Sequence, residues 1–596
     1  MTNTMQRPSP ADLLSGVIAA AENAGALIRA EFHRDGGPRG QGSKAAVDDE
    51  VEELLKAQLQ RLHPCRWNGE ETTRDRIDTR DIWVVDPHDG TRDFLKRHRG
   101  SAISIALLRD RRPVLGVVFA PVAPDDRGDL IAWAEGSVLT RNGSIVPRRT
   151  PSTAATAPVL ALNADAADFA RHNHQKLPGI RIRALPSPAY RLALAAASEV
   201  DVGASLVGGL DAWDIAGAHA LLIGAGLPLV DLLGKAVDYR VGSFDGVVGG
   251  RAEAVDRIVA AGLGAGKKVP RQPARPAARI GLAERLSRAQ GCLLGQLAGD
   301  ALGSAVEFLS EGEIGRRHPH GVTQLVDGGT WNLIAGQPTD DSEMALALAR
   351  TIVKEGRFNP TSVSAAYVAW RASGPFDIGG TTANSITALS AGRIASSDSQ
   401  ANGALMRVSP IGILAAGDPA RAARLAREDA GLTHPHPVCG AANAAYAAGI
   451  AAGIAGAGAE EIWAAAHANA GHGGGAEAVR FRLIAARHSC PDDYQHQMGW
   501  VLTALQNAFF WLMRGAPMAE ALPATVARGG DTDTNAAICG ALLGAAQGRD
   551  AVPRQWRNAV LTCRPVAAPG IRHPRPADYW PDDALDLAEA LLAAGA

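Results

Sequence analysis

The sequence predicts two domains of different fold class, an α/β half followed by a half that is almost entirely helical. At 596 residues, the chain is too long for one ordinary domain. Strand-like and helix-like segments alternate up to about residue 264, which is typical of an α/β domain. From residue 284 onward the sequence is Ala-rich with few β-branched runs, which favours helices. We therefore expect domains at 1–264 and 284–596.

Residues 265–283 change character and separate the two predicted domains. They contain Pro270, Pro273 and Pro276, five basic residues and no acidic residue. This composition favours a solvated, partly extended linker. A docking strip for a phosphate-rich ligand is the alternative, but the interleaved aromatic residues of such a strip are missing.

Composition predicts a globular protein of the cytoplasm. The chain is 46% hydrophobic and 20% charged with a net charge of −2, so it lacks the basic excess of a nucleic-acid-binding protein. Its six cysteines are scattered without Cys-x-x-Cys spacing, which suits a reducing compartment. The N-terminus has no apolar signal-peptide core, and no 18-residue uncharged run is apolar enough for a membrane span. We expect neither a membrane nor a nucleic-acid partner.

The α/β half begins with two predicted helices. Ser9-Pro10-Ala11-Asp12 has the features of a helix start, and apolar residues then recur at helical spacing as far as Ile28. A second amphipathic helix runs from about Val51 to Leu62. A strand at 82–85 follows, and then a strand pair at 101–108 and 113–120 joined by a charged turn.

Acidic residues in this half come from three separate places. Asp86 ends the apolar strand, and Asp89 follows three residues later across a Pro/Gly turn that aims both carboxylates at one point. Glu70 lies in an upstream loop, and Asp214 lies at a predicted helix start. Such a set suits a phosphoesterase with several metal ions, which neutralise phosphate oxygens and activate water. A plain turn is the alternative for Asp86-Pro87 taken alone.

These motifs resemble the inositol monophosphatase family over most of residues 10–264. The matching pieces are Glu70-Glu71, Asp86-Pro87-His88-Asp89-Gly90-Thr91-Arg92-Asp93-Phe94 and Trp213-Asp214-Ile215-Ala216-Gly217. The resemblance implies a layered α/β sandwich that hydrolyses a phosphate monoester. It also implies that Mg²⁺ ions are held by Glu70, Asp86, the His88 carbonyl, Asp89 and Asp214.

The same resemblance implies roles for the turn after Asp89. Thr91 and Glu70 would position the attacking water, and the N–H groups of Gly90 and Thr91 would bind phosphate. Two positions depart from the family. Ala46 stands where a Thr is often found, and Val207 stands where inositol-specific members carry a sugar-binding Glu. Phosphatase chemistry is therefore expected, but inositol is not the expected substrate.

Two short acidic stretches dominate the helical half. Gly336-Gln337-Pro338-Thr339-Asp340-Asp341-Ser342-Glu343 and Arg528-Gly529-Gly530-Asp531-Thr532-Asp533-Thr534-Asn535 each place carboxylates and hydroxyls before an apolar run of helical period. One Asp is enough to cap a helix start. The four aspartates of two such starts would repel one another without cations between them. We therefore expect a site for Mg²⁺ or Mn²⁺, with two ordinary helix caps as the alternative.

The first predicted helix of this half carries Gly291, Gly295, Gly299 and Gly303 at i+4 spacing. Each Gly costs a helix up to ~1 kcal/mol relative to Ala. A stripe of four therefore predicts that a neighbouring element, most simply a helix, approaches this face closely. A membrane Gly-x-x-x-Gly contact is not expected, because polar residues interrupt the segment.

The acidic stretches, with Gly299-Asp300-Ala301-Leu302-Gly303 and Glu307, resemble the ADP-ribosylglycohydrolase family from about 286 to 590, and most closely its bacterial members of the dinitrogenase reductase-activating type. Further matching pieces lie at 376–379, 402–407 and 433–437. The resemblance implies an all-α fold with a binuclear Mg²⁺/Mn²⁺ site. Its ligands would be Thr339, Asp340, Asp341, Asp531, Asp533 and Thr534. The implied reaction removes ADP-ribose from a modified protein or small molecule.

Four more residues are candidates for work at this site. Cleavage of a glycosidic bond passes through an oxocarbenium-like state that carboxylates stabilise. Glu307 and Asp377 are the candidates for acid/base or substrate-orienting roles, with surface or cap carboxylates as the alternative. His434 suits a pocket hydrogen bond better than a metal ligand in an oxygen-rich site. Trp500 is either part of an apolar core or a platform that stacks on adenine.

The sequence thus predicts a bifunctional metal-dependent hydrolase. One rival is an active C-terminal domain with a degenerate, regulatory N-terminal domain, which Ala46 and Val207 favour. A second rival is a protein that binds ADP-ribose without turnover, but pure binding needs fewer carboxylates than the two stretches retain. We also hypothesise that the phosphatase acts on a phosphorylated ADP-ribose or an adenosine nucleotide, because fusion keeps related activities at high effective concentration. The alternative is two independent activities.

Overall fold

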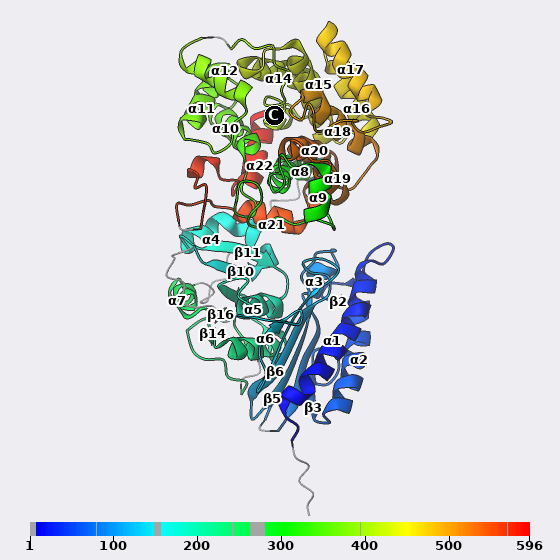
Figure 1. The fold of residues 1–596 in the computed structure, drawn as a ribbon, viewed down its shortest axis with the longest axis vertical. Coiled ribbons are helices and arrows are strands. Elements are labelled where there is room, and N and C mark those ends of the chain that lie inside the picture. The colour runs from blue at the N-terminus through cyan, green and yellow to red at the C-terminus, as the bar shows by residue number, and fades with distance from the viewer. Residues whose placement is uncertain are drawn as a thin grey trace, which may run out of the picture. The chain divides into compact units, whose positions relative to one another are not determined.

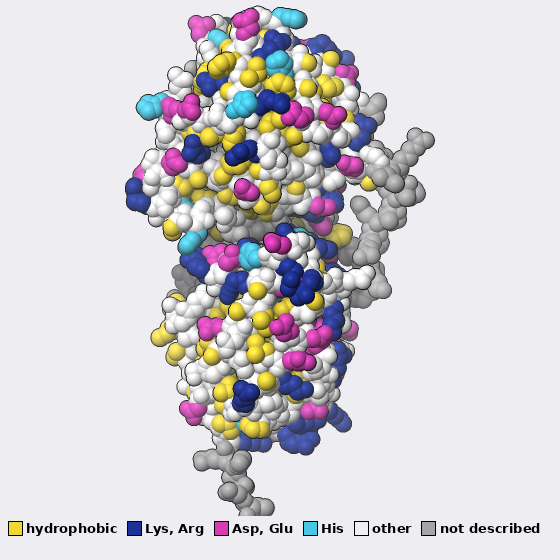
Figure 2. All heavy atoms as spheres, turned by 90° about the vertical axis from the view of Figure 1, so that its right-hand side faces the viewer, with side chains coloured by type: hydrophobic (Ala, Val, Ile, Leu, Met, Phe, Trp, Pro, Cys, Tyr) yellow, Lys and Arg dark blue, Asp and Glu magenta, His cyan; other side chains and the backbone are white. Residues whose placement is uncertain are grey.

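The computed structural model describes residues 7–78, 80–147, 157–240, 243–262, 280–393, 395–568 and 570–595 (Figure 1). Contacts within the chain divide it into two compact units, Met1–Arg271 and Gln272–Ala596. Most of the predicted linker at 265–283 lies outside the described residues. On the face drawn in Figure 2, basic and acidic side chains are interspersed, in keeping with the net charge of −2.

The first unit is built on a seven-stranded sheet of order β3-β4-β5-β6-β7-β8-β9. Its strands are β3 (Arg66–Gly69), β4 (Ile82–Asp89), β5 (Ala102–Arg109), β6 (Arg112–Ala120), β7 (Asp129–Ala134), β8 (Thr140–Arg141) and β9 (Ser144–Ile145). The predicted strand pair is confirmed as β5 and β6, which pair antiparallel. Asp110 and Arg111 between them both have positive φ (51° and 64°), the backbone that a two-residue hairpin turn needs.

Both faces of this sheet are buried. Every residue of β4 is buried, and so is every residue of β5 except the last, Arg109. On one face the strands pack with α1 (Pro10–Phe32) and α2 (Ala46–Leu62), and on the other with α5 (Pro188–Ala196) and α6 (Ala212–Ala225) (Figure 1). Because neither face meets water, the central strands carry consecutive apolar residues, as at 82–85, instead of a strict apolar/polar alternation.

A second sheet lies beyond α5 and has the order β11-β10-β12-β16-β14. Its strands are β10 (Val159–Asn163), β11 (Arg181–Leu185), β12 (Val202–Ser205), β14 (Leu229–Asp231) and β16 (Val247–Gly250). The unit is completed by β1 (Gly40–Gln41), β2 (Lys44–Ala45), α3 (Thr91–Phe94), the 3-10 turn Ala164–Phe169, α4 (Ala170–Lys176), β13 (Leu210–Asp211), β15 (Ser243–Phe244) and α7 (Ala252–Ala260). The layers alternate between helices and sheets, so the predicted layered α/β sandwich is confirmed.

The second unit is helical, as predicted. Its described residues form a few isolated β-bridges but no strand of two or more residues. The elements that carry or directly follow candidate site residues are α8 (Ile280–Gly303), α10 (Asp340–Glu355), α12 (Gly380–Ser390), α18 (Val501–Met513) and α20 (Thr532–Gln547). The others are α9 (Glu311–Arg317), α11 (Pro360–Ala372), α13 (Ser409–Leu414), α14 (Pro419–Thr433), α15 (Pro437–Ile454), α16 (Ala459–Asn469), α17 (Gly474–Ala485), α19 (Met518–Val526), α21 (Arg554–Thr562) and α22 (Ala584–Gly595), with 3-10 turns at Arg549–Ala551 and Ala577–Tyr579.

The glycine stripe of α8 faces α20 at backbone contact, which confirms the predicted close approach. A Cβ on Gly295 would lie 2.1 Å from the carbonyl oxygen of Gly540, and one on Gly299 would lie 2.2 Å from that of Ala536. A Cβ on Gly303 would lie 2.3 Å from the carbonyl oxygen of Thr532. The stripe therefore places the C-terminal end of α8 against the acidic start of α20.

Two helices correct the expectation that no segment is apolar enough for a membrane span. By length and hydropathy alone, both Pro10–Phe32 and Pro437–Ile454 pass that test. The Pro437–Ile454 window is 89% buried inside the helical unit, as expected of a core helix. Pro10–Phe32 is the amphipathic helix that packs on the large sheet.

Candidate active sites

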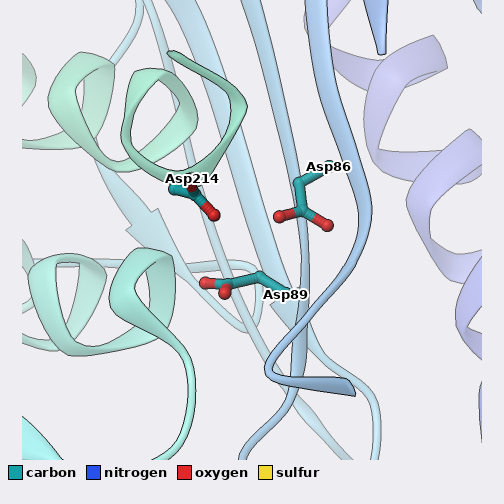
Figure 3. A group of neighbouring side chains, drawn as sticks. All are labelled: Asp86, Asp89 and Asp214. Atoms are coloured by element: carbon teal, nitrogen blue, oxygen red, sulfur yellow. The ribbon is translucent and has the colours of Figure 1, made fainter. Parts of the chain in front are cut away.

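Three carboxylates of the first unit converge at the end of β4. Asp86 and Asp89 come from the last residues of β4, and Asp214 comes from the first turn of α6. Each offers one oxygen, and these oxygens all lie within 4.8 Å of one another (Figure 3). Glu70, directly after β3, lies close enough to Asp86 for the two carboxyls to interact, and it completes the predicted set of four acids. The structure thus brings together the acids that the sequence placed in three separate regions.

Burial and mutual repulsion raise the pKa values of these acids. Burial, then Glu70, Asp89 and Asp214, raises the pKa of Asp86 well above its usual range. Burial also raises the pKa of Asp89 to about 6, even though Ser187 and the Ala189 N–H donate to its carboxylate. The pKa of Glu70 rises to about 7 for the same reasons. Four ionised carboxylates can lie this close together only with cations between them. Carboxylate oxygens are the ligands that Mg²⁺ prefers.

Hydrogen bonds fix the turn that carries the first two acids. The His88 N–H donates to Oδ1 of Asp86 at 2.8 Å, and the Thr91 hydroxyl donates to the His88 carbonyl at 2.6 Å. The buried His88 ring is held between Asp48 (Nδ1 to Oδ1, 2.7 Å) and Ser101 (Nε2 to Oγ, 3.0 Å). The Thr91 hydroxyl therefore donates its proton to the carbonyl of His88, the predicted metal ligand. Its oxygen can still accept a hydrogen bond from water.

Gly90 lies at the start of a short helix, whereas Ala46 and Val207, the two departures from the family pattern, are exposed. Gly90 has φ of 92°, a left-handed conformation that favours glycine, and it precedes α3, which starts at Thr91. Ala46 is exposed at the first position of α2. Val207 is 57% exposed, in the loop between β12 and β13.

Glu52 was missed by the sequence reasoning, although it orders the loop of Glu70. It lies on α2, is fully buried and accepts from Trp67 Nε1 (3.0 Å), the Glu71 N–H (2.7 Å) and the Thr72 N–H (3.2 Å). These donors fix the residues on either side of Glu70. The available signal was a Glu beside Val51 on the apolar side of a predicted helix.

Three carboxylates also converge in the second unit. They are Glu307, in the loop after α8, Asp377, three residues before α12, and Asp533, in the first turn of α20. One oxygen of each lies within 4.8 Å of the others. Burial, then Asp377, raises the pKa of Glu307 to about 8, and burial and Asp531 raise the pKa of Asp377 to about 6.

The two acidic helix starts meet beside this cluster. The Thr534 hydroxyl at the start of α20 donates to Asp341 Oδ2 at the start of α10, at 3.2 Å. Oδ1 of Asp341 is buried with no hydrogen-bond partner among the described residues. Burial and neighbouring acids raise the pKa values of Asp340, Asp341 and Asp533 well above their usual range. A buried carboxylate oxygen without a donor, surrounded by acids, fits a bound cation.

Asp300 on α8 is a second residue whose role the sequence did not show. It is fully buried and accepts from the Thr339 N–H (3.1 Å), the Thr339 hydroxyl (2.9 Å) and the Ser342 N–H (3.1 Å). Burial raises its pKa to about 7. Asp300 therefore caps α10 and orients Thr339, although it lies on another helix.

The last two predicted residues, Trp500 and His434, lie next to the segment of Asn402 and Gly403. Asn402 donates to Asp531 Oδ2 at 2.6 Å, and its N–H donates to the carbonyl of Gly499, next to Trp500. The half-buried Trp500 ring contacts the Arg482 guanidinium at 4.8 Å, and its Nε1 donates to Gln400. His434 is buried, with Nδ1 bonded to Thr433, whereas Nε2 has no partner among the described residues. Burial and Arg407 lower the His434 pKa to about 3, so the ring is neutral.

A layered α/β unit with acids from three separate regions and an all-α unit with paired acidic helix starts together define a two-domain hydrolase. The chain belongs to the ADP-ribosylglycohydrolase family, whose model matches residues 282–595. Its first half, residues 10–263, matches the model of the inositol monophosphatase family. Metal dependence is typical of both families.

Individual relatives match one half each. The ADP-ribosyl-[dinitrogen reductase] glycohydrolase of Rhodospirillum rubrum is 31% identical over 279 residues, which cover 45% of this chain and 88% of the relative. The ADP-ribosylarginine hydrolase Tri1 of Pseudomonas putida is 41% identical over 110 residues, 17% of this chain and 28% of that protein.

For the first half, the 3'(2'),5'-bisphosphate nucleotidase CysQ of Salmonella typhimurium is 27% identical over 157 residues. These cover 26% of this chain and 61% of the nucleotidase. Among solved structures, an ADP-ribosylglycohydrolase-related protein complex is 27% identical and covers 53% of this chain and 100% of its own, with a TM-score of 0.43.

Proposed function

We propose that the second unit hydrolyses the glycosidic bond between ADP-ribose and a modified protein or small molecule. The observation that carries this proposal is the meeting of the two acidic helix starts, marked by the Thr534–Asp341 bond and the unpartnered Asp341 oxygen. Two Mg²⁺ or Mn²⁺ ions would be held by Thr339, Asp340, Asp341, Asp531, Asp533 and Thr534. When bound, they supply positive charge for the ribose hydroxyls and for water.

The residues of this chain divide the remaining work. Burial raises the pKa of Glu307 to about 8 and that of Asp377 to about 6, so Glu307 retains a proton more readily than its neighbour does. A pair split in this way can give a proton to the leaving group and stabilise positive charge at the anomeric carbon. Asp300 holds Thr339, and Asn402 holds Asp531, so both acidic starts are oriented before substrate binds.

Removing one charge from each acidic start tests this proposal. Asp340→Asn and Asp533→Asn are each expected to lower kcat for ADP-ribose release by at least ~100-fold, because each removes a proposed metal ligand while keeping the shape of the side chain. The substrate is an ADP-ribosylarginine protein assayed with Mn²⁺ or Mg²⁺, chosen because a relative is an ADP-ribosylarginine hydrolase. Asp492→Asn, an exposed acid of the same unit, is the control. Wild-type turnover in either site variant would refute the assignment.

We propose that the first unit hydrolyses a phosphate monoester at the cluster of Asp86, Asp89, Asp214 and Glu70. The convergence of these carboxylates supports it. With the His88 carbonyl they would hold Mg²⁺, which neutralises phosphate oxygens. Thr91 and Glu70 would position water, and the N–H groups of Gly90 and Thr91 would bind the phosphate.

The substrate we propose is an adenosine nucleotide or a phosphorylated ADP-ribose. Two observations support it. Val207 supplies no carboxylate for inositol hydroxyls, and a relative of this half is a bisphosphate nucleotidase. If both units act on adenosine-containing ligands, the fusion also has a functional advantage. A site tethered to another encounters the product of that site at high local concentration.

Comparing substrates on the full chain tests this idea. We expect kcat/KM for adenosine 3',5'-bisphosphate or ADP-ribose phosphates to exceed that for inositol monophosphate by at least ~10-fold, since one lost or gained polar contact changes discrimination by about that factor. A preference for inositol monophosphate would remove the link between the two units. If no phosphoester in a broad panel is hydrolysed, the first unit is the degenerate, regulatory module of the rival hypothesis.

A further inference from the structure

A segment near the C-terminal end of the helical unit, residues 571–580, contacts the loops that carry acids of the second site. Its first contacts are made by His573. The His573 carbonyl accepts from Nε2 of Gln337, a residue of the first acidic stretch, at 2.7 Å. The His573 ring lies 4.5 Å from the ring of Phe376, which directly precedes Asp377. The 571–580 segment therefore borders both the acidic start of α10 and the loop of Asp377.

Arg575 of the same segment joins these two regions directly. Its Nε and Nη2 donate to the two carboxylate oxygens of Glu343 on α10, each at 2.8 Å. Its Nη1 donates to the carbonyl of Ser373 at 3.0 Å, and Nη2 donates to the Ser373 hydroxyl at 2.8 Å. The side chains of Arg575 and Glu343 are only 3% and 2% exposed. A planar guanidinium that binds two partners at once fixes the distance between them, which a Lys ammonium does less well.

The two regions that Arg575 joins carry carboxylates that repel each other. Asp340 lies three residues before Glu343 on α10, and Asp377 lies four residues after Ser373. The regions meet, because the backbone N–H two residues after Asp377 donates to Asp340 Oδ2 at 3.4 Å. Burial, then Asp377, raises the pKa of Asp340 well above its usual range. Repulsion between the two acids pushes their segments apart, and the bonds of Arg575 oppose that separation.

We propose that Arg575 is a positioning residue of the second site, and that it sets the spacing between Asp340 and Asp377 at which Mn²⁺ or Mg²⁺ binds. This inference rests on the proposed function of the second unit. A residue that fixes the segment of a metal ligand changes metal affinity without touching the metal. Stability alone is a poor explanation of the Arg575–Glu343 pair, because desolvation offsets most of the attraction in a buried ion pair.

Arg575→Lys tests this role because it keeps the charge and removes the planar fork that reaches Glu343 and Ser373 together. Mn²⁺ binding is measured without substrate, from the EPR signal of free Mn²⁺, on the full chain carrying Asp86→Asn so that the first site is weakened. We expect Kd for Mn²⁺ to rise at least ~10-fold, as when an outer partner of a metal ligand is lost. At saturating Mn²⁺, kcat for ADP-ribose release should fall by at least ~10-fold while KM stays within about 2-fold.

Arg350→Lys is the matched control. Arg350 also lies on α10 and ties that helix to the C-terminal part of the chain, through the Trp580 carbonyl and Asp583, both at 2.7 Å. It should lower the Tm as Arg575→Lys does and leave Kd for Mn²⁺ within about 2-fold.

A double variant keeps the test decisive if Arg575→Lys does not fold. Glu343→Gln combined with Arg575→Met removes both charges, so no buried charge is left unpaired. It also removes the bonds to Ser373. We expect Kd for Mn²⁺ to rise at least ~10-fold in this variant too.

The outcomes separate this inference from the proposed function. Values of Kd and kcat within about 2-fold of wild type in Arg575→Lys, whatever its Tm, overturn the positioning role. An equal rise of Kd in Arg350→Lys also overturns it, because any loosening of the C-terminal part would then have the same effect. A chain that binds Mn²⁺ but releases no ADP-ribose contradicts the proposed function, while the comparison of Kd values still decides the role of Arg575. If the Asp86→Asn chain binds no Mn²⁺, the inference falls together with the metal site.

Discussion

At the scale of single residues, the chemistry depends on carboxylates that burial keeps from ionising freely. Asp89, Glu70, Asp300, Asp377 and Glu307 have pKa values raised to about 6, 7, 7, 6 and 8. Each lies in a cluster of further acids, so each holds its proton more tightly than an exposed carboxyl does when no cation is present. A bound cation favours the ionised form and opposes this shift.

These shifts predict how stability depends on pH. Glu307 has a folded-state pKa of about 8 against an ordinary value of 4.5, so the folded protein binds a proton that the unfolded chain releases. Its contribution to the free energy of unfolding is complete below pH 4.5 and is lost as pH rises toward 8. We therefore expect the Tm in EDTA to fall between pH 5 and pH 8, and the increase in Tm on adding Mn²⁺ to grow over the same range.

Thermal denaturation at several pH values, with EDTA or with Mn²⁺, checks this expectation. Asp341→Asn should weaken both trends, because it removes one of the interacting acids. A Tm in EDTA that rises from pH 5 to pH 8 would contradict the account of the clusters.

The sequence was sufficient for most acids of both sites but not for the residues that hold them. Asp86, Asp89 and Asp340 follow from local motifs, because a strand end or a helix start fixes where each carboxylate points. Asp300 and Glu52 lie on other helices, and their roles come from tertiary contacts with Thr339 and with the loop of Glu70. No local pattern encodes such contacts.

At the scale of elements, the contact between α8 and α20 sets the geometry of the second site. The glycines of α8 let the two backbones touch along several turns, and the last of them, Gly303, meets the first residues of α20. Periodicity alone predicted this contact, although it could not say which helix would be the partner. The apolar runs in β4 and β5 were likewise predictable as strands, and they are apolar because neither face of their sheet meets water.

Gly295→Ala tests the helix contact. Its Cβ would lie 2.1 Å from the backbone oxygen of Gly540, which cannot rotate away, so the helices must separate. Overpacking costs ~1–3 kcal/mol and outweighs the ~1 kcal/mol that Ala gains in a helix, so the free energy of unfolding should fall. Gly315→Ala on α9, where a Cβ has nothing within 4 Å, should be neutral or stabilising. Urea denaturation of both variants measures the change in the free energy of unfolding. A Gly295→Ala protein as stable as wild type would contradict the close contact between α8 and α20.

At the scale of the whole molecule, two hydrolase domains share one chain. Each compact unit has its own core and its own buried acid cluster. The described residues of each cluster all belong to a single unit. Local motifs were enough to predict the two fold classes, because strand and helix periodicities differ sharply between the halves. The segment at 265–283 remains a predicted linker, and a cytoplasmic location remains a prediction from composition.

The central claim, two separate hydrolytic sites on one chain, is tested most directly by a crossed assay of two variants of the full chain. Asp86→Asn and Asp340→Asn are each measured for phosphate release from adenosine 3',5'-bisphosphate and for ADP-ribose release from an ADP-ribosylarginine protein. We expect Asp86→Asn to lose phosphate release and keep ADP-ribose release within about 2-fold of wild type, because no described residue belongs to both clusters. Asp340→Asn should show the reverse. Loss of both activities in either variant, or of neither in both, would contradict the claim.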